Sequence, residues 1–565
     1  MKHIYLILIC SIVLVSCSKN KKEADSNASI FGGISLFESN EITIDTSLIA
    51  SYKDIDLSGI YKEFGSETIW NEDNLRKSAL DILLNTEKDG LLSKNYSASI
   101  LEDLNKSYPS LSDSTKINFD LLLTLNLKTF FRHLYSGRFK PKDIYNDWDL
   151  PENNFDVVLV LKDAILAKNL KEAYTFCEPK NKTYQQLKLA LIEIKKLPKD
   201  TIAKIQLKEK LVALKQNKEV ITIKQRLQYW NDAKFDTLTA FFDKQMLVGL
   251  KKFQKRHGLL ADGIIGNSTL KALNYSQQQR EEQITANLER WRWFKRDFGD
   301  NYLLLNIPDY KLFAIKDKDT AQIQRIVVGK STRKTPILES KISNIVLNPN
   351  WTVPPTILKE DVFPLAIKDK GTFAKKGLNV VNNKGETVNP YSWKIEDAWK
   401  YKYVQNPSRN NSLGLMKINF PNKHSVYLHD TNHRDYFDIH KRSLSSGCVR
   451  LEKPLTMAAY LLNDSIKWNI QKIRDTTDIR HYNKIRNEKQ LKIEEKNRKL
   501  IAKNPDLIME EKILPKSKLL TTSIPIQTKI NIYQYYWTAW SKDNTLHFRE
   551  DIYSLDHLLF ERLDN

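Results

Sequence analysis

A cysteine and a histidine in the last quarter of the chain have the residue types that nucleophilic acyl transfer requires. Cys448 lies in the segment SSGCVR, and His429 lies upstream in the segment YLHDT. A thiol with an ordinary pKa near about 8.5 is only a few per cent ionised at neutral pH, so it needs a base or a positive surrounding. His429 is therefore the candidate base for the Cys448 thiol.

The residues around this pair suit the same chemistry. Gly447 allows a turn that aims backbone N–H groups at a developing oxyanion, with the amide of the cysteine itself as the second donor. Tyr427 lies two residues from His429, so both side chains project from the same face of a strand. Arg450 can offer two parallel hydrogen bonds to a substrate carboxylate, or it can pair with a neighbour such as Glu452.

Two questions about the histidine stay open from the residues alone. Asp430 could orient its ring, but adjacent strand residues face opposite sides of a sheet, so a backbone carbonyl is an equally good partner. A zinc site is conceivable because His429 and His433 are four residues apart and Cys448 could add a ligand. The Asp-Thr-Asn between the histidines favours a turn over a helix, and no HExxH glutamate is present, so we expect no metal. We expect the other nearby histidines on the surface: His424, His433 and His440.

The elements that must position these residues are β-strands. From Asn301 onward, apolar residues alternate or form short runs in YLLLNIPDYKLFAI, IQRIVVGK and ISNIVLNPNWTVPP. Residues 355–400 interrupt the strands with a Lys-rich, aromatic stretch, for which we expect a small inserted lid. Strands resume in LGLMKINF and HSVYLHD, and a helix is expected from about Pro454 to Leu462.

The amino terminus predicts export and lipidation. Residues 1–16 combine Lys2 and His3 with an apolar run that is too short to span a bilayer, as in a signal peptide. The run ends in LVSC, which resembles the lipobox of bacterial lipoproteins, so Cys17 is the expected lipidation site; a plain secretory signal is the alternative. We expect a periplasmic protein of the cell envelope, anchored by lipid, with the outer membrane favoured over the inner.

Composition narrows the partners. The 565-residue chain predicts three to four domains, and its net charge of +21 fits an anionic envelope polymer. No basic arm, zinc knuckle or RNP-like aromatic pattern occurs in the sequence, which argues against nucleic acid. Beyond Cys10 and Cys17, the remaining cysteines are Cys177 and Cys448. Cys177 lies in a helical pattern and is expected to be buried, although a disulfide between these two remains open.

Two helical regions precede the strands. Residues 49–218 show helical spacing of apolar residues, for example in Asn74–Asn85 and Asp120–Tyr135, and no catalytic constellation. Residues 219–275 predict three short helices. Their phrase FQKRHGLLADGIIGNSTLKAL resembles the three-helix peptidoglycan-binding domain, and the matching residues are Phe253, Gln254, Gly258, Asp262, Gly263, Gly266 and Thr269.

The residue types in this segment suit a small three-helix fold, in agreement with the resemblance. The glycines allow positive φ in the turn, and Asn267 or Ser268 can cap the third helix. Phe253 can fill a small core with Leu250 and Leu273. Because such a core would also persist in a domain that only spaces its neighbours, the phrase leaves both binding and spacing open.

Residues from about 287 to 475 resemble the YkuD-type catalytic domain of L,D-transpeptidases. The phrases NLERWRW, VVGKSTRKTP, LNPNWTVPP, YLHDT and SSGCVRLEKP are similar to its large YcbB-like branch. That branch joins a helical scaffold, a peptidoglycan-binding module and a catalytic sheet in this order. As in that branch, Ser446 stands where the wider family usually has histidine. The charged, helix-prone residues 480–520 are a departure, and the sequence assigns them no role.

The resemblance implies a multidomain α+β protein. Its expected parts are a signal peptide (1–16), lipidated Cys17 with a flexible tether (17–48), a helical scaffold domain (49–218), a three-helix peptidoglycan-binding domain (219–275), a linking helix (276–298), a mainly-β catalytic domain (299–475, lid about 355–400), and a helical insertion with a C-terminal segment (476–565).

The resemblance also implies a reaction. Cys448 would be the nucleophile, His429 the base, and Gly447 part of the oxyanion site. The implied substrate-binding residues are Arg450, Tyr427, Ser446 and Trp351. A donor tetrapeptide stem would form a thioester, release D-alanine, and pass to a diaminopimelate amine as a 3-3 cross-link, with carbapenems as inhibitors and no cofactor. The alternatives are an L,D-carboxypeptidase, a zinc amidase, and a non-catalytic lipoprotein that tethers the membrane to peptidoglycan.

Overall fold

The computed structural model describes residues 41–51, 57–153, 155–504, 513–514 and 518–564. The predicted signal peptide and Cys17 lie outside these described residues. Within them, no helix has both the length and the apolar character needed to cross a membrane.

The first part is an α-helical region with one main core, while α8 packs its buried residues into the core of the large sheet. Its helices are α1 (Thr46–Ser51), α2 (Ser58–Tyr61), α3 (Asp73–Leu84), α4 (Ala98–Lys106), α5 (Asp113–Ser136), α6 (Val157–Leu166), α7 (Leu170–Cys177) and α8 (Lys182–Lys195). The two helices predicted from apolar spacing are confirmed as α3 and α5. Most of residues 197–218 are irregular, however, and Leu211 pairs with Ile265 of the next module.

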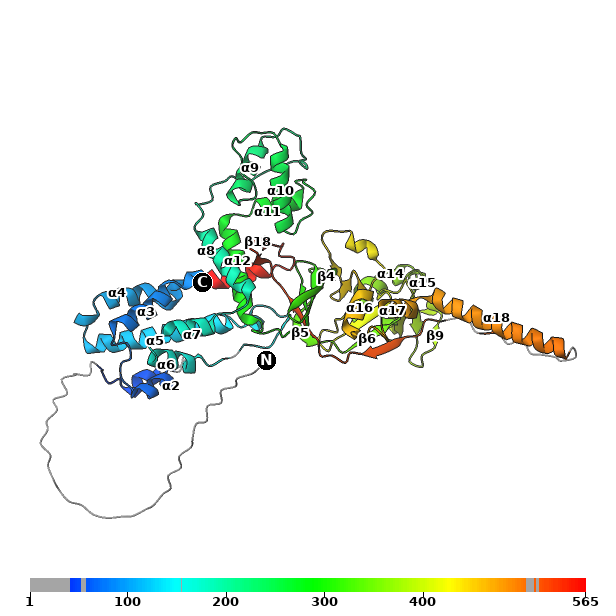
Figure 1. Cartoon of the computed structure of the whole chain (residues 1–565), viewed down its shortest axis with the longest axis horizontal. Helices are drawn as coiled ribbons and strands as arrows, with labels where there is room; N and C mark the ends of the chain where they lie inside the picture. Colours follow the sequence, from blue (N-terminus) through cyan, green and yellow to red (C-terminus); the bar gives the residue numbers. More distant parts are fainter. Residues whose placement is uncertain (1–40, 52–56, 154, 505–512, 515–517, 565) are drawn as a thin grey trace, which may run out of the picture.

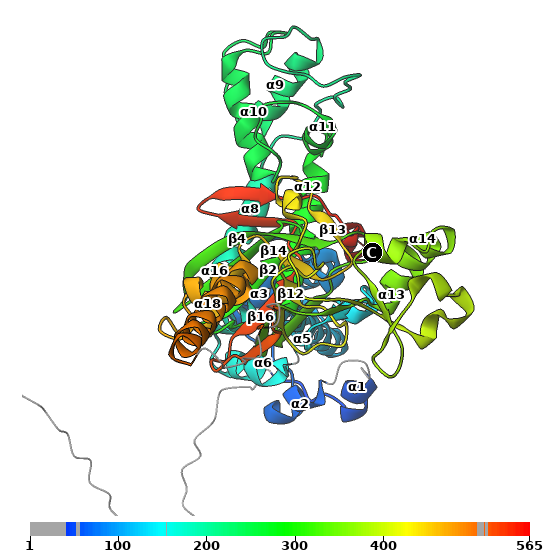
Figure 2. The ribbon, with the colours of Figure 1, turned by 90° about the vertical axis from the view of Figure 1, so that its right-hand side faces the viewer.

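The second part is a small three-helix module, which Figure 2 shows standing away from the rest of the molecule. It consists of α9 (Glu219–Tyr229), α10 (Lys244–Arg256) and α11 (Asn267–Leu273). The predicted core is confirmed, because Leu250, Phe253 and Leu273 are fully buried together.

Helix α12 (Gln277–Trp293) joins the parts of the molecule (Figure 1). It contacts α5 and α8 of the helical domain as well as β17 (Ala539–Lys542) and α19 (Leu555–Asp564) near the C-terminus. Two of its buried arginines are paired with carboxylates: Arg290 lies 2.5 Å from Asp556, and Arg292 lies 2.8 Å from Glu289. Pairing of this kind is what makes buried guanidinium groups tolerable.

The third part is built on a twelve-stranded sheet with the order β1-β5-β16-β2-β3-β4-β14-β12-β11-β6-β15, and β13 pairs with β4. The strands are β1 (Trp148–Asp149), β2 (Tyr302–Asn306), β3 (Lys311–Lys316), β4 (Asp319–Gly329), β5 (Ile337–Lys341), β6 (Asn344–Leu347), β11 (Met416–Asn419), β12 (Leu428–His429), β13 (Ser443–Ser445), β14 (Val449–Leu451), β15 (Thr522–Pro525) and β16 (Asn531–Tyr535). The predicted strand regions from residue 301 to 430 are confirmed, and together the parts confirm the multidomain α+β class.

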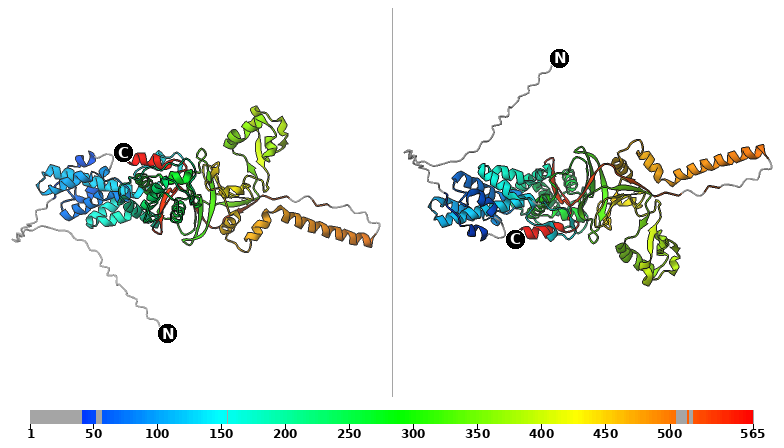
Figure 3. Two further views of the ribbon diagram at one scale, coloured as in Figure 1. Left: turned by 90° about the horizontal axis from the view of Figure 1, so that it is seen from above. Right: turned by 90° about the horizontal axis from the view of Figure 1, so that it is seen from below.

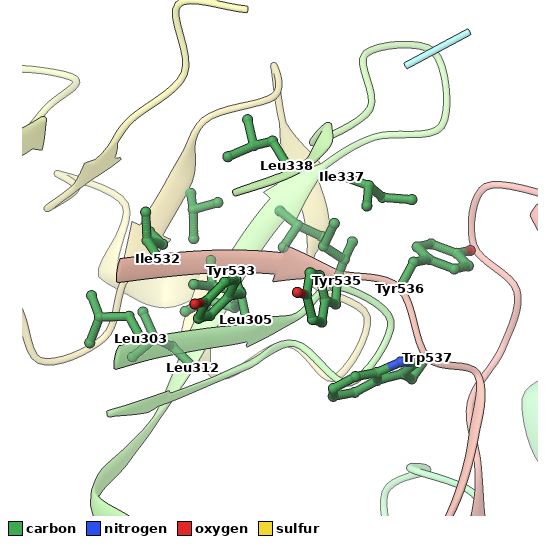
Figure 4. Packing of buried hydrophobic residues seen from close by; sticks show 14 of the residues in the cluster. Leu303, Leu305, Leu312, Ile337, Leu338, Ile532, Tyr533, Tyr535, Tyr536 and Trp537 are labelled. Carbon is green, nitrogen blue, oxygen red and sulfur yellow. The ribbon is translucent and has the colours of Figure 1, made fainter. Parts of the chain in front are cut away.

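The C-terminal segment belongs to this sheet. Strand β16 pairs in parallel with β2 and antiparallel with β5, so it lies inside the sheet. Figure 4 shows Ile532, Tyr533 and Tyr535 of β16 packed against Leu303, Leu305 and Leu312. The boundary expected at residue 475 therefore separates strands that pair with one another, because sheet pairing joins segments far apart in the sequence.

A lid subdomain, residues 351–405, is inserted between β6 and β11. It contains β7 (Trp351–Thr352), α13 (Pro355–Ile357), a π-helical turn (Leu358–Val362), α14 (Phe363–Lys368), α15 (Thr372–Lys375), β8 (Asn379–Val381), β9 (Thr387–Val388) and β10 (Lys402–Gln405). It has its own buried core, which includes Phe373, Trp393 and Tyr403. Figure 3 shows it projecting from the side of the sheet.

After the sheet, α16 (Pro454–Leu462) forms over the predicted range, followed by α17 (Ile470–Thr477) and α18 (Ile479–Lys503). Helix α18 buries none of its residues and extends away from the rest of the molecule (Figure 1). The remaining elements are the hairpin of β17 with β18 (Thr545–Phe548), and α19.

Candidate active site

Strand register brings the predicted site residues onto one face of the sheet. Strands β12 and β14 run parallel, with Leu428 opposite Val449 and His429 opposite Arg450. Leu428 and Val449 are fully buried in the core. Because side chains alternate along a strand, His429 and Arg450 project from the opposite face. The Tyr427 and His429 rings meet edge to face with centroids 5.7 Å apart, as expected from their spacing.

The Cys448 thiol is partly buried beside Tyr427. Tyr427 approaches it with both its backbone N–H and its hydroxyl. Burial raises the pKa of the Cys448 thiol above its ordinary value, while these two groups of Tyr427 and the charges of Lys417 and Arg450 act in the opposite direction. Cys177 is a free, buried thiol in the helical domain, so the disulfide considered above is absent.

His429 is buried and neutral. Burial lowers the pKa of its imidazole to about 3, and the charges of Arg450 and Lys417 add to this effect. The Asp430 carboxylate is engaged elsewhere, since it accepts bonds of 2.9 Å from the Leu415 amide and 2.9 Å from Arg434. The Asp430 backbone carbonyl favours the protonated ring, but the contact falls short of a full hydrogen bond and leaves Nδ1 without one among the described residues.

The turn before the cysteine is held by two hydroxyl groups that the sequence did not reveal. Gly447 has a φ of +112°, which an L side chain rarely adopts. Its carbonyl accepts a 2.8 Å bond from Thr335. Its N–H donates to the Ser445 hydroxyl at 3.2 Å, and this hydroxyl donates to the Cys448 carbonyl at 2.6 Å. The Gly447 amide is thus occupied, and within the described chain the Cys448 amide is the one left open for an oxyanion.

Arg450 has no carboxylate partner among the described residues. Its Nη1 donates to the Thr431 hydroxyl at 3.1 Å, and its guanidinium carbon lies 5.1 Å from the Tyr436 ring centroid. The alternative partner Glu452 is wrong, because Glu452 pairs with Arg325 at 2.7 Å. Arg450 is therefore held in place by neutral groups and keeps its charge available.

The lid subdomain reaches the site at two residues. The Trp351 side chain approaches the Tyr427 hydroxyl and lowers the pKa of that group. Ser446 accepts a 2.9 Å bond from Arg333 Nη1. Arg333 also binds the lid, through bonds of 2.8 Å to Glu360 and 2.9 Å to Asp361. One guanidinium thus connects the cysteine turn to the lid.

Lys417 is a site residue that sequence reasoning missed. It lies on β11 with its Cα opposite that of His429, and its ammonium is 4.0 Å from the Tyr427 ring centroid. The alternation in LGLMKINF already placed it on the face opposite Met416 and Ile418. Which strand it would pair with was not visible from that pattern.

The other histidines lie away from the thiol. His433 and His440 are exposed as expected, and His424 is partly exposed. The His440 ring bonds to the Gly258 carbonyl of the three-helix module. Among the described residues, no group of three or more His, Cys, Asp or Glu side chains could hold a metal ion.

The phrase that runs from α10 to α11 of the three-helix module forms an internal network of hydrogen bonds. The buried Gln254 side chain donates to Asp262 at 3.0 Å and to the Ile264 carbonyl at 2.9 Å, and it accepts from the Gly263 amide at 2.9 Å. The Thr269 hydroxyl lies 3.3 Å from the side-chain nitrogen of Gln254. These residues therefore hold the turn between α10 and α11.

Two details of that turn differ from expectation. Gly258 and Gly263 have positive φ, but Gly266 has a φ of −94° and needs no glycine for its backbone. Gly266 itself occupies the N-cap of α11 without a side-chain bond, so neither Asn267 nor Ser268 caps this helix. The helix begins one residue earlier than the capping prediction assumed.

Three family models match successive parts of the chain. Residues 56–191 match "Scaffold domain", residues 216–273 match "Putative peptidoglycan binding domain", and residues 300–504 match "L,D-transpeptidase catalytic domain". A Haemophilus influenzae protein described as "Putative L,D-transpeptidase" is 32% identical over 278 residues. That alignment covers 49% of this chain and 48% of the relative, so the chain spans about half the length of the curated relative it matches.

Two solved structures are also similar. A fragment of an L,D-transpeptidase from Xylanimonas cellulosilytica is 13% identical with a TM-score of 0.15, covering 45% of this chain and 92% of its own. An L,D-transpeptidase from Stackebrandtia nassauensis is 15% identical with a TM-score of 0.20, covering 46% of this chain and 91% of its own.

Proposed function

We propose that this chain, which carries an L,D-transpeptidase catalytic domain together with a peptidoglycan-binding domain and a scaffold domain, is a peptidoglycan L,D-transpeptidase. The observation that carries the proposal is the sheet face from which His429 and Arg450 project side by side, next to a Cys448 thiol that Tyr427 contacts and that the Arg450 charge reaches. A cysteine that only filled the core would not need polar and charged neighbours.

In the proposed reaction, the Cys448 sulfur attacks the carbonyl that joins the third residue of a donor tetrapeptide to its terminal D-alanine. The thiol proton passes to His429, and the negative charge on the carbonyl oxygen is stabilised by the Cys448 amide. The C–N bond then breaks, and the D-alanine amine leaves with the proton from His429. A thioester between Cys448 and the donor stem remains.

The second half-reaction releases the enzyme. The side-chain amine of a diaminopimelate on another stem attacks the thioester, and His429 accepts its proton. The C–S bond breaks and the thiolate regains a proton, which gives a 3-3 cross-link; water as acceptor would give carboxypeptidase activity. Arg450 supports substrate selection, because its unpaired charge suits a stem carboxylate. No step requires a metal or a nucleotide.

The proposal extends to location and role. The peptidoglycan-binding module, α9–α11, would keep the catalytic domain at the wall, and lipidation of Cys17 would hold the protein to a membrane of the cell envelope. Cell-wall cross-linking and remodelling is the proposed role. Carbapenems should acylate Cys448, because their strained carbonyl presents the same electrophile to the thiol.

The test is incubation of disaccharide-tetrapeptides with the soluble fragment that begins near Ala28, followed by mass spectrometry. A dimer that has lost one D-alanine, absent with Cys448→Ala, is the expected result. Cys177→Ala is the matched control, because it removes the other described thiol from a site far from the sheet face. D-alanine release without dimer would mean a carboxypeptidase.

The non-catalytic tether is the competing function. It predicts that folded protein with a reduced thiol converts no stem peptide and that Cys448→Ala changes nothing. The zinc amidase would instead lose activity with a chelator and carry metal after purification.

A further inference from the structure

Lys417 is an unpaired, half-buried cation on the reactive face of the sheet. Its neighbours on β11, Met416 and Ile418, are fully buried in the core. Lys417 therefore projects from the opposite face, and its Cα is the partner of the His429 Cα across the strand pair. The sheet itself fixes this position, so the side chain starts from a rigid element.

Two other cations around the site are paired with carboxylates, and a third, Arg450, donates a hydrogen bond to a neutral hydroxyl. Arg333 binds Glu360 and Asp361, Arg434 binds Asp430, and Arg450 is held by Thr431. Within the described residues the Lys417 ammonium makes no ion pair and no hydrogen bond. Its one close contact is the Tyr427 ring, with 4.0 Å between Nζ and the ring centroid.

Such an arrangement is costly unless it serves a negative charge. Burial lowers the pKa of the Lys417 ammonium, which means that the fold destabilises the charged form at this position. A cation–π contact returns only part of that cost. An uncompensated cation beside a group that becomes anionic is a recurring way to lower the barrier to ionisation.

The group that can become anionic is the Cys448 thiol. The Tyr427 residue that lies under the ammonium also approaches the thiol with its hydroxyl and its backbone N–H, and both lower the pKa of the thiol. The groups that act on the thiol are Tyr427, which directly precedes β12, and two cations, Lys417 of β11 and Arg450 of β14. Of the two cations, Lys417 lowers the pKa of the thiol more than Arg450 does.

We propose that Lys417 is a positioning residue for the nucleophile: its ammonium, held over the Tyr427 ring, supplies the positive field in which the Cys448 sulfur carries negative charge. Lys417 stays protonated throughout, and no bond to it forms or breaks. The inference rests on the proposed function only for its consequence in turnover, because the field acts on the thiol whether or not a stem peptide is present.

The test compares alkylation of Cys448 by anionic iodoacetate and neutral iodoacetamide, at low ionic strength, with the modified residue identified by peptide mass spectrometry. The ratio of the two rates reports the local field, because a change in the thiolate fraction affects both reagents alike. We expect the ratio to fall about threefold or more in Lys417→Met, since a nearby charge of this kind is only partly screened. Lys417→Arg should retain the ratio.

The matched control is Lys341→Met, which removes an exposed lysine from β5 of the same sheet. Thermal unfolding shows whether each variant is folded, and Lys417→Gln replaces Lys417→Met if the latter is not. An unchanged ratio in a folded Lys417 variant would overturn the proposal and leave the residue a packing role. A changed ratio in a protein that never cross-links stem peptides would sustain it while the proposed function fails.

Discussion

At the scale of single residues, the site holds the proposed nucleophile, Cys448, and the proposed base, His429, as two uncharged groups. Burial raises the pKa of Cys448 and lowers the pKa of His429, so a resting thiolate–imidazolium pair is disfavoured on both sides. In the proposed reaction, proton transfer from the thiol to His429 accompanies the attack on the carbonyl. The polar groups of Tyr427 and the charge of Lys417 would act at that moment, when the sulfur is most negative.

The first prediction concerns the pH dependence of acylation. A His429 pKa of about 3 keeps the ring neutral and able to accept a proton well below the ordinary histidine value of about 6.5. The rate of single-turnover acylation should therefore start to decrease only below about pH 5. Mass spectrometry of the carbapenem adduct measures this rate. On the alkaline side, the rate should still rise beyond about pH 8.5, because burial raises the thiol pKa.

Stability must be followed in the same experiment. The unfolded chain binds a proton at His429 near about pH 6.5, whereas the folded chain does so only near 3. The neutral histidine thus contributes stability that is fully present above about pH 6.5 and decreases as the pH falls toward 3. Rates are compared only where thermal melts show folded protein. A loss of acylation centred near pH 6.5 in folded protein would contradict a buried neutral base.

At the scale of secondary-structure elements, local patterns predicted most of what positions the site. The alternation around His429 and the helix at Pro454–Leu462 depend on neighbouring residues, and both appear in the structure. The partners of each strand depend on distant residues, and there the sequence could not decide. The sequence pattern predicted that Lys417 lies in a strand, but its position opposite His429 follows from the pairing between β11 and β12. The hydroxyls of Ser445 and Thr335, which hold the cysteine turn, were hidden for the same reason.

The second prediction concerns the connection between the lid subdomain and the cysteine turn. Arg333→Gln removes charge-assisted bonds to Glu360 and Asp361 and weakens the contact to Ser446. Bonds to charged groups contribute about 1.5–3 kcal/mol in favourable cases, so the lid should open more often. We expect KM for the donor stem to rise by about tenfold while kcat changes less, together with faster hydrogen exchange in residues 358–375.

The control for this variant is Lys375→Gln, which breaks an exposed ion pair with Asp369 inside the lid and leaves the Arg333 contacts intact. Exposed pairs contribute about 0–1 kcal/mol, so little change in KM is expected. Equal effects of the two substitutions would mean that the lid responds to its own stability and not to its attachment at the cysteine turn.

At the scale of the whole molecule, the C-terminal segment supplies an inner strand of the large sheet and a helix that packs on α12. Strand β16 lies between β5 and β2, and α19 packs on α12, whose Arg290 is paired with Asp556. The last forty residues therefore complete both the sheet and the junction with the helical domain. From the sequence, residues 476–565 were expected to form a separate segment because they follow the other strands in the chain. In the structure, β15 and β16 of this segment pair with those strands. Nothing in the local pattern of NIYQYYW distinguishes an inner strand of this sheet from an edge strand.

The third prediction separates the two parts of that segment. Asn348 Nδ2 donates to the Thr476 carbonyl at 2.8 Å and to the Leu520 carbonyl at 3.1 Å, so the two ends of the segment that contains α18 are held at one place, just after β6. Since α18 buries none of its residues, replacing residues 479–518 by a short Gly-Ser linker should cost little stability. Thermal melts and carbapenem acylation should both remain close to those of the full chain.

Truncation after residue 520 is the opposite case. It removes β15 from the sheet edge, β16 from the sheet interior and the Asp556 partner of a fully buried Arg290. Leaving a buried charge unpaired costs about 3–5 kcal/mol by itself, and the lost strand exposes the apolar side chains of β2 and β5. We therefore expect the truncated chain to lose cooperative unfolding and the acylation of Cys448 together. A folded, acylated truncation product would show that the sheet closes without β16, and a linker variant that fails to fold would show that α18 supports the sheet despite its exposure.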